Sequence, residues 1–312
     1  NYVETRVVYF GEKHDEERSF GQRCYREDAN ILFENLVDML APFVKIIGDR
    51  HTKCLPQLKE LHFPFKDVRE SQREFILDTF RAIRSHKRLI VQAPTGTGKT
   101  MASVYPAIKS IGEGYADKVF YLTGKATTAY AAINAIDIMR ESIPDFRAIH
   151  ISSKEKCCKS SKIKDRRKCK DENCPRSRGF YDKINLALAE LLRDYRTYTM
   201  DIIDTVAEKY SICAYELSLE LSEWCELIVC DYNYLFDLQV YLRRYFSAVD
   251  ANYVFLIDEA HNLPDRAREM YSATLARSDF AKIENKDEEV CKIFKRFIDI
   301  SINEEFISRN CF

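Results

Sequence analysis

The eight residues 93–100, APTGTGKT, constrain the fold of this 312-residue chain more than any other segment does. The short apolar run 88–92 precedes them and predicts a buried strand, and a stretch with helical spacing follows. A Gly-rich loop between a strand and a helix curls its N–H groups around phosphate oxygens, and the helix N-terminus adds the positive end of its dipole. The segment therefore predicts a P-loop NTPase, an α/β domain with a parallel sheet.

The loop residues that we expect to bind ATP and Mg²⁺ are Thr95, Gly96, Thr97, Gly98, Lys99 and Thr100. The Lys99 ammonium would reach the β- and γ-phosphates, and the Thr100 hydroxyl would ligate Mg²⁺. A chance Gly-rich turn is the alternative, which the strand–loop–helix context disfavours.

A second motif, DEAH, follows the apolar run 253–257, which predicts another strand. Adjacent carboxylates at the end of a strand are typical of a Walker B motif. Asp258 would hold the Mg²⁺ shell, and Glu259 would orient and deprotonate the attacking water. With Lys99 they form the expected catalytic set, to which we add His261 as a coupling residue. A solvated strand end is the alternative for a lone carboxylate pair, and the phosphate loop in the same chain disfavours it.

Further apolar runs predict strands, and helical patterns alternate with them, which favours a mostly parallel α/β sheet. These runs are 118–123, 146–151 and 226–230. Residues 152–178 are instead rich in Lys, Arg and Cys and predict an insertion between strands. No apolar run approaches the ~18 residues that a membrane-spanning helix needs. The net charge of −1 gives no indication of partners, so a nucleic-acid surface would have to be a local patch.

These motifs, in this order, resemble the XPD/DinG-like group of superfamily 2 DNA helicases, in a bacterial form. Ala93, where the general loop has Gly, is the usual residue in that superfamily. The resemblance implies a RecA-like motor lobe and extends over about residues 60–270. The segments that carry it are FPFKDVRESQREF (63–75), APTGTGKT (93–100), LTGKATT (122–128), the four-cysteine insertion, CDYNYLFD (230–237) and DEAHNLPDRAREM (258–270).

The resemblance also implies roles for residues outside the two ATP motifs. Arg69 and Gln72 belong to the segment that recognises adenine. The residues implied in DNA binding are Lys125, Thr127, Thr128, Tyr232 and Asn233. Gly124 and Ala126 depart from the family's usual LTART sequence. Residues 231–234 match a stretch that lines the DNA path in relatives, and tyrosines packed at the end of a core strand are the alternative.

Eleven cysteines without a secretion signal favour metal binding over a disulfide framework. By resemblance, a 4Fe–4S cluster is held by Cys158, Cys169, Cys174 and Cys213. Cys157 is the alternative first ligand, and Ala214 stands where relatives usually have Pro. Four thiolates could also hold Zn²⁺, although zinc ribbons use two tight Cys pairs and this segment has one. The basic residues around these cysteines form either a solvated loop or a rim that contacts DNA phosphates.

The expected domain organisation follows the motifs. Residues 1–60 are expected to be the end of an upstream accessory segment, with a strand pair and a helix. The lobe is expected over 61–150 and 224–268, interrupted by an iron–sulfur domain over 151–223. Residues 269–312 resemble the beginning of a helical arch domain. No second RecA-like lobe fits in the chain, so we expect this piece alone to be poorly active.

We therefore expect an ATP-dependent DNA helicase that moves 5′ to 3′ on single strands and unwinds duplex at junctions, in repair or replication. It is expected to act as a monomer in the cytoplasm, associated with the nucleoid of a bacterium and not with a membrane. One alternative is a nucleic-acid-stimulated ATPase that remodels protein–DNA complexes without unwinding. The others are a zinc-bearing relative, an RNA substrate, and a scaffold that has lost catalysis, which the intact Lys99, Asp258 and Glu259 oppose.

Overall fold

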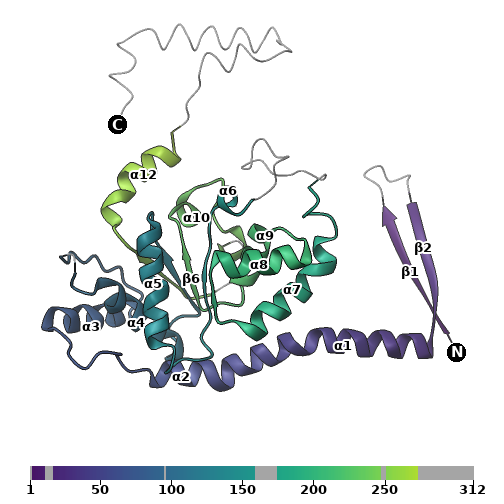
Figure 1. Ribbon diagram of the computed structural model, residues 1–312, viewed down its shortest axis with the longest axis horizontal. Coiled ribbons are helices and arrows are strands. Elements are labelled where there is room, and N and C mark those ends of the chain that lie inside the picture. The colour runs from purple at the N-terminus through teal and green to yellow at the C-terminus, as the bar shows by residue number, and fades with distance from the viewer. Residues whose placement is uncertain (1, 11–16, 95, 159–173, 247–250, 273–312) are drawn as a thin grey trace, which may run out of the picture. The chain divides into compact units, whose positions relative to one another are not determined.

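The computed structural model describes residues 2–10, 17–94, 96–158, 174–246 and 251–272 (Figure 1). The chain divides into two compact units, residues 1–263 and 264–312. The first unit holds both nucleotide motifs. None of the helices in the described ranges is long and apolar enough to cross a membrane.

Five parallel strands form the central sheet in the order β5-β4-β6-β3-β7. In chain order the strands are β3 (Lys118–Leu122), β4 (Ala148–His150), β5 (Thr197–Tyr198), β6 (Leu227–Cys230) and β7 (Tyr253–Ile257). Four of them fall on the apolar runs that predicted strands, because parallel strands buried on both faces are apolar throughout. The prediction of a parallel α/β fold is confirmed.

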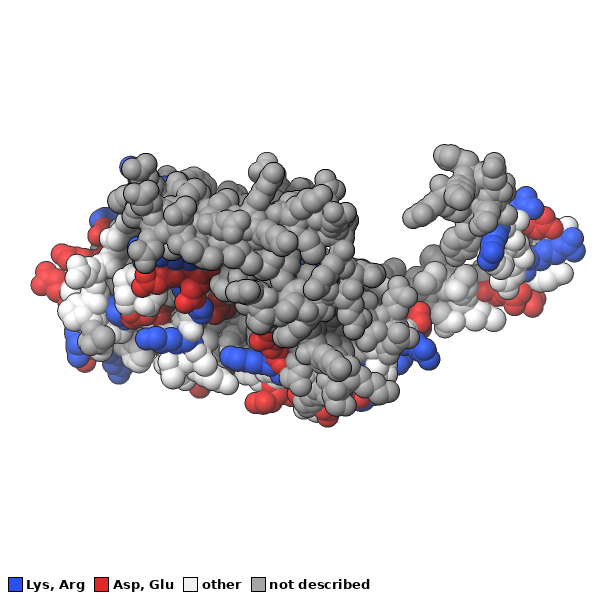
Figure 2. Space-filling view, turned by 90° about the horizontal axis from the view of Figure 1, so that it is seen from above, with Lys and Arg blue, Asp and Glu red and all other residues white. Residues whose placement is uncertain are grey.

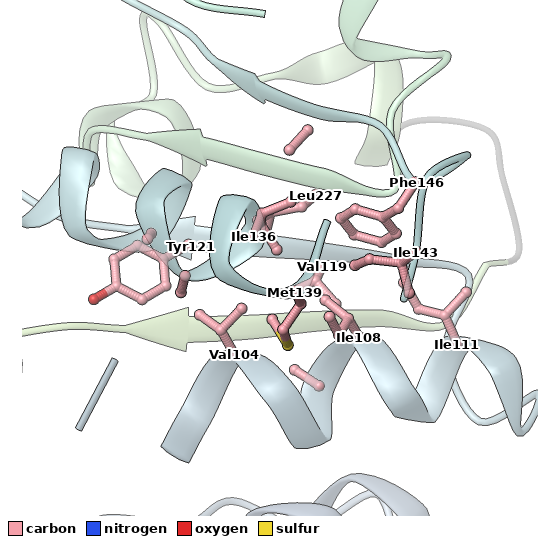
Figure 3. Packing of buried hydrophobic residues seen from close by; sticks show 14 of the residues in the cluster. Val104, Ile108, Ile111, Val119, Tyr121, Ile136, Met139, Ile143, Phe146 and Leu227 are labelled. Carbon is pink, nitrogen blue, oxygen red and sulfur yellow. The ribbon is translucent and has the colours of Figure 1, made fainter. Parts of the chain in front are cut away.

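Helices α4 (Lys99–Gly112) and α5 (Ala126–Met139) lie to one side of β6 in Figure 1. Helices α7 (Phe180–Asp194), α8 (Met200–Tyr210) and α9 (Ala214–Ser222) lie to the other. Val104 and Ile108 of α4 point toward Val119 of β3 and pack with Ile136 and Met139 of α5 (Figure 3). All five side chains are buried. This cluster fixes the helix that follows the phosphate loop against the sheet.

An antiparallel hairpin and a long helix precede the sheet, as the sequence predicts. Strands β1 (Tyr2–Phe10) and β2 (Glu17–Tyr25) pair from Tyr2 opposite Tyr25 to Phe10 opposite Glu17. Helix α1 (Arg26–Asp49) leads into a π-helix, η1 (Arg50–Cys54), and then into α2 (Leu55–Glu60).

The π-helix and α2 pack into the core of the lobe, although the sequence placed residues 1–60 before it. Cys54, Leu58 and Leu61 are at most 2% exposed and belong to the same buried cluster as α4. A Cβ added at Gly112, the last residue of α4, would lie 2.4 Å from the backbone N of Lys59. The backbones of α2 and α4 therefore cross at a distance that only glycine permits.

One predicted strand is wrong: residues 88–92 form no strand in the described structure. Leu89 and Val91 are exposed and Ile90 is 97% exposed, while the sheet ends at β7. Of the expected strand, loop and helix around the phosphate-binding motif, the structure therefore contains the loop and the helix but not the strand. A short apolar run becomes a strand only where a neighbouring edge pairs with it, and periodicity contains no information about that edge.

The other helical elements of the described residues follow in chain order. They are α3 (Glu70–Arg84), α6 (Lys154–Cys157), α7 (Phe180–Asp194), α8 (Met200–Tyr210), α9 (Ala214–Ser222), α10 (Asn233–Phe236), α11 (Arg243–Phe246), a 3₁₀ turn η3 (Ala260–Asn262) and α12 (Leu263–Met270). The helical patterns over 69–84, 181–195 and 200–210 are confirmed by α3, α7 and α8. Cys169 and most of the predicted arch lie outside the described residues.

Candidate nucleotide site and cysteine segment

The phosphate loop turns through two glycines with positive φ. Gly96 has φ +80° and Gly98 φ +75°, a left-handed region that side-chain-bearing residues rarely adopt. Gly98 caps the N-terminus of α4, so Lys99 and Thr100 begin the helix. The Thr97 hydroxyl donates to the carbonyl oxygen of Pro94 at 2.8 Å and closes the loop. Free N–H groups at a helix N-terminus are suited to an anion. Thr95 lies outside the described residues.

The DEAH box lies beside this loop because β7 pairs with β3. The Asp258 N–H donates to the carbonyl oxygen of Leu122 at 3.0 Å, which extends the ladder by one residue. Lys99 Nζ lies 3.6 Å from Glu259 Oε1, and His261 Nδ1 lies 3.4 Å from Glu259 Oε2. Three of the four residues in the expected catalytic set are thus in contact.

Tyr121 lies near Thr100 and Asp258, the two expected Mg²⁺ ligands. No motif in the sequence indicates this role. Its ring is buried on β3, and its hydroxyl points away from the apolar cluster (Figure 3). The side chains of Thr100 and Asp258 lie close enough to the hydroxyl to act on its pKa. Burial, and then the negative charge of Asp258, raise the pKa of Tyr121 above its ordinary value, so the phenol stays protonated. The side chains of Thr100 and Asp258 therefore lie close to the same hydroxyl group.

A cavity of 390 Å³ opens beside the loop. Its lining residues come from the segment predicted to recognise adenine and from the loop itself: Phe65, Lys66, Asp67, Arg69, Gln72, Gly96, Thr97 and Gly98. A Cβ on Gly98 would lie 2.7 Å from Gln72 Nε2, so the two segments are in close contact. Phe65 is 47% exposed and gives this cavity an aromatic wall that the sequence analysis missed. The FPF sequence before Arg69 was its only signal.

The residues proposed to bind DNA divide into exposed and buried ones. Lys125 and Thr127 are exposed at the N-terminus of α5, while the Thr128 hydroxyl donates to the Lys125 carbonyl oxygen at 2.9 Å. Tyr232 is 1% exposed, and its hydroxyl donates to the backbone carbonyl oxygen of Asp258. Its ring presents no surface on which a base could stack. The structure favours the alternative of packed tyrosines for this residue, and Asn233 beside it is half-buried.

Charged side chains of both signs are interspersed among the described residues of the face in Figure 2. This mixture agrees with the net charge of −1 for the whole chain. A nucleic-acid surface on these residues would depend on local contacts such as those of Lys125, because the charges nearby are of both signs.

Three of the four proposed cluster ligands are described: Cys174 is buried, and Cys158 and Cys213 are half-buried. Within the described residues, no three His, Cys, Asp or Glu side chains converge as a metal site. Cys213 precedes α9, where the N–H groups of Tyr215 and Glu216 hydrogen-bond to its sulfur. Burial raises the pKa of Cys213, and these N–H groups oppose that rise, since they stabilise a thiolate.

Cys157 is more deeply buried than its neighbour Cys158. Its side chain is 5% exposed, with Sγ 3.7 Å from the carbonyl oxygen of Ser152 and 3.3 Å from Met200 Sδ. Burial raises the pKa of the Cys157 thiol to about 12. Cys158 is half-buried and is therefore the more accessible of the two residues.

Two family profiles match the chain: DEAD/DEAH box helicase over residues 71–161 and DEAD_2 over residues 128–280. Together the two profiles span residues 71–280, so the chain carries DEAD/DEAH box and DEAD_2 helicase domains. Among the relatives of this DEAD_2 chain is the regulator of telomere elongation helicase 1 homolog of Caenorhabditis briggsae, 24% identical over 261 residues. That match covers 71% of this chain and 26% of the relative.

A second relative is the general transcription and DNA repair factor IIH helicase subunit XPD of Arabidopsis thaliana, 21% identical over 246 residues. The match covers 70% of this chain and 32% of the relative. A solved structure described as an XPD helicase aligns with a TM-score of 0.51 and 20% identity, over 75% of this chain and 40% of the other. The resemblance to the XPD group is confirmed, with the RecA-like fold. The DEAD_2 chain spans about a quarter to a third of these curated relatives.

Proposed function

We propose that this DEAD_2 chain supplies the first motor lobe of an ATP-dependent DNA helicase. The contact between Lys99 and Glu259 carries the proposal, because it joins the phosphate loop to the DEAH box at one end of the sheet. Tyr121 brings Thr100 and Asp258 to the same place, where both could bind Mg²⁺. The two helicase profiles that match the chain agree with this chemistry.

Each group has a defined role in the proposed reaction. Lys99 leaves its pairing with Glu259 to bind the β- and γ-phosphates, and Thr100 and Asp258 hold Mg²⁺ directly or through water. Glu259 then orients a water molecule on the γ-phosphate and accepts its proton. Arg69, Gln72 and Phe65 flank the cavity beside the loop, and we assign them to the adenine base.

Nucleotide binding to this chain tests the first step. We expect a fluorescent ATP analogue to bind in the presence of Mg²⁺ and Lys99→Ala to weaken binding by at least about tenfold, since a charge-assisted contact to phosphate is lost. Lys45→Ala is the matched control, because Lys45 is exposed on α1. Equal affinity of the Lys99 and Lys45 variants would contradict the proposed site.

We further propose that Cys158, Cys169, Cys174 and Cys213 hold a 4Fe–4S cluster. Thiolates are the ligands that iron–sulfur clusters use, and the N–H groups directed at Cys213 suit a ligand sulfur. The cluster would organise a segment that has few aliphatic residues of its own. Anaerobically purified protein should be brown with iron and sulfide, and Cys158→Ser should remove the colour while Cys157→Ser keeps it. Colourless protein with stoichiometric zinc would show the zinc-bearing alternative instead.

Translocation and unwinding belong to the whole protein in this proposal. The full-length protein should displace a strand from a duplex with a 5′ single-stranded tail, using ATP, as a monomer in the bacterial cytoplasm. DNA-stimulated hydrolysis without strand displacement would instead favour the remodelling ATPase. A strand-displacement assay with DNA and RNA tracks separates the two substrates.

A further inference from the structure

Two buried tyrosines on the short segment after β6 point to two different sites. Tyr232 is 1% and Tyr234 is 6% exposed, so neither ring is available at the surface. They are two residues apart, at the start of α10. The Tyr232 hydroxyl contacts the DEAH box. The Tyr234 hydroxyl contacts the first residue of the Cys-rich stretch 152–178, which we call the cysteine segment.

The Tyr232 hydroxyl holds the backbone of the DEAH box. It donates to the carbonyl oxygen of Asp258, lies 3.5 Å from that of Glu259, and lies near the backbone N–H of Gly124. Gly124 and Asp258 follow the neighbouring strands β3 and β7, so this one hydroxyl ties their ends together. Glu259 has φ +50°, a strained conformation for a residue with a side chain, which persists only where its surroundings hold it.

The Tyr234 hydroxyl holds the cysteine segment. It donates to the carbonyl oxygen of Ser152 at 3.0 Å and lies near the hydroxyl of Tyr215. The same Ser152 carbonyl faces the sulfur of Cys157 at 3.7 Å. Tyr215 stands two residues after Cys213. Tyr234 therefore joins the stretch before Cys158 to the stretch after Cys213.

A rigid backbone connects the two hydroxyls. The Phe236 N–H donates to the Tyr232 carbonyl oxygen at 3.0 Å, which closes the single turn of α10. The Leu242 N–H donates to the Tyr234 carbonyl oxygen at 2.9 Å and fixes the turn from its other side. The segment begins directly after β6, an inner strand of the sheet. These two hydrogen bonds restrain the backbone around Tyr232 and Tyr234.

We propose that Tyr232 and Tyr234 couple the nucleotide state of the DEAH box to the cysteine segment. This inference rests on the proposed function, because it requires that nucleotide binds beside Glu259. When phosphates take Lys99 from Glu259, the backbone carbonyls that Tyr232 holds shift, α10 follows, and Tyr234 changes its hold on Ser152. The coupling is reciprocal, so an ordered cysteine segment also favours one nucleotide state.

Hydrogen exchange of the peptide 151–158 tests the coupling, in the protein with and without Mg²⁺ and ATPγS. In the wild-type protein, nucleotide should change its exchange rate by about fivefold or more. Tyr232→Phe and Tyr234→Phe should each still bind a fluorescent ATP analogue but lose this change. The double variant should add nothing further, since both substitutions interrupt one connection. Tyr245→Phe is the control, because its buried hydroxyl hydrogen-bonds to Ser222 Oγ at 2.6 Å and, within the described residues, to neither Asp258 nor Ser152.

An equal nucleotide-dependent change in the wild type and in both tyrosine variants overturns the inference. So does nucleotide binding that leaves exchange of the wild-type peptide unaltered. Failure of the wild-type chain to bind any nucleotide is a different outcome, which removes the proposed function and the inference with it. If Tyr232→Phe does not fold, Tyr215→Phe interrupts the connection at its far end and carries the same expectation.

Discussion

Lys99 Nζ and Glu259 Oε1 lie 3.6 Å apart, so the residue expected to bind phosphate is paired with the residue expected to activate water. Both side chains are about one-third exposed, and water screens the attraction between them. In the proposed reaction, phosphates that bind Lys99 replace this carboxylate, and the weakness of the pair favours that exchange.

Glu259→Gln should separate binding from hydrolysis. The amide cannot accept the proton of water, so ATP turnover by the full-length protein should fall by at least about 100-fold. Affinity for ATP should stay equal or rise by a few-fold, because the competing negative charge is gone. Equilibrium binding and single-turnover hydrolysis measure the two effects. Weaker binding by Glu259→Gln than by Lys99→Ala would contradict the assigned roles.

Gly112→Ala should destabilise the lobe. The added Cβ would lie 2.4 Å from the N of Lys59 and 2.6 Å from the backbone C of Leu58, so α2 and α4 would have to separate. We expect a loss of about 1–3 kcal/mol in the free energy of unfolding. Urea denaturation measures it.

Gly48→Ala is the matched control for that substitution. Nothing lies within 4 Å of its Cβ position on α1, and alanine favours a helix more than glycine does. The stability should stay unchanged or rise by up to about 1 kcal/mol. If the two variants unfold at the same urea concentration, the close crossing of α2 and α4 is not present in solution.

Glu226→Ala should be more damaging than its position at the start of a strand suggests. The carboxylate is 2% exposed, accepts the N–H of Arg147 at 2.9 Å, and pairs with Arg50 Nε at 3.3 Å. Removing it leaves the buried N–H of Arg147 without its acceptor and Arg50 without its carboxylate partner, although Arg50 still donates to the carbonyl oxygen of Asp117 at 3.2 Å. We expect a cost of about 3 kcal/mol. Glu223→Ala removes a half-exposed partner of Arg244 and should change stability by less than about 1 kcal/mol. Equal losses in the two variants would contradict this difference.

Alkylation of Cys157 should depend steeply on pH. Burial raises the pKa of its thiol to about 12, so at pH 8 only about one molecule in ten thousand carries the reactive thiolate. Below that pKa the thiolate fraction, and with it the rate, should rise about tenfold for each pH unit. Peptide-resolved alkylation with iodoacetamide measures the rate, and the urea-unfolded chain is the reference. A native rate close to the unfolded rate at pH 8 would mean that Cys157 is accessible.

The apolar runs predicted β3, β4, β6 and β7 correctly, because each of these segments pairs with a neighbouring strand of the sheet. The run 88–92 has the same character and forms no strand, with Ile90 97% exposed. The difference lies in the pairing with a neighbouring strand, which one segment of sequence does not contain. Strand β5 consists of only two residues, Thr197 and Tyr198, and a segment this short shows no apolar pattern from which a strand could be predicted.

The residues of the site that belong to known sequence motifs could be predicted from the sequence. Lys99 and Glu259 follow from motifs, and the structure brings them into contact. Tyr121 and Phe65 were missed because their roles arise from contacts with segments distant in the chain. Tyr232 was assigned to DNA by resemblance, and its burial shows that it contacts the DEAH backbone instead. A tyrosine in a motif looks the same in sequence whether its ring is exposed or packed.

The packing of residues 50–61 decides where a recombinant form of the lobe can begin. A protein that started at Phe63 would keep both ATP motifs but lose Cys54, Leu58 and Leu61 from the core. The face of α4 that these residues cover would then be apolar and exposed to solvent. We expect such a protein to aggregate and to be recovered in inclusion bodies. A start before Arg50 retains the side chain that reaches Glu226 as well as the helix that covers α4. The smallest soluble form of this motor lobe is therefore longer than its motifs.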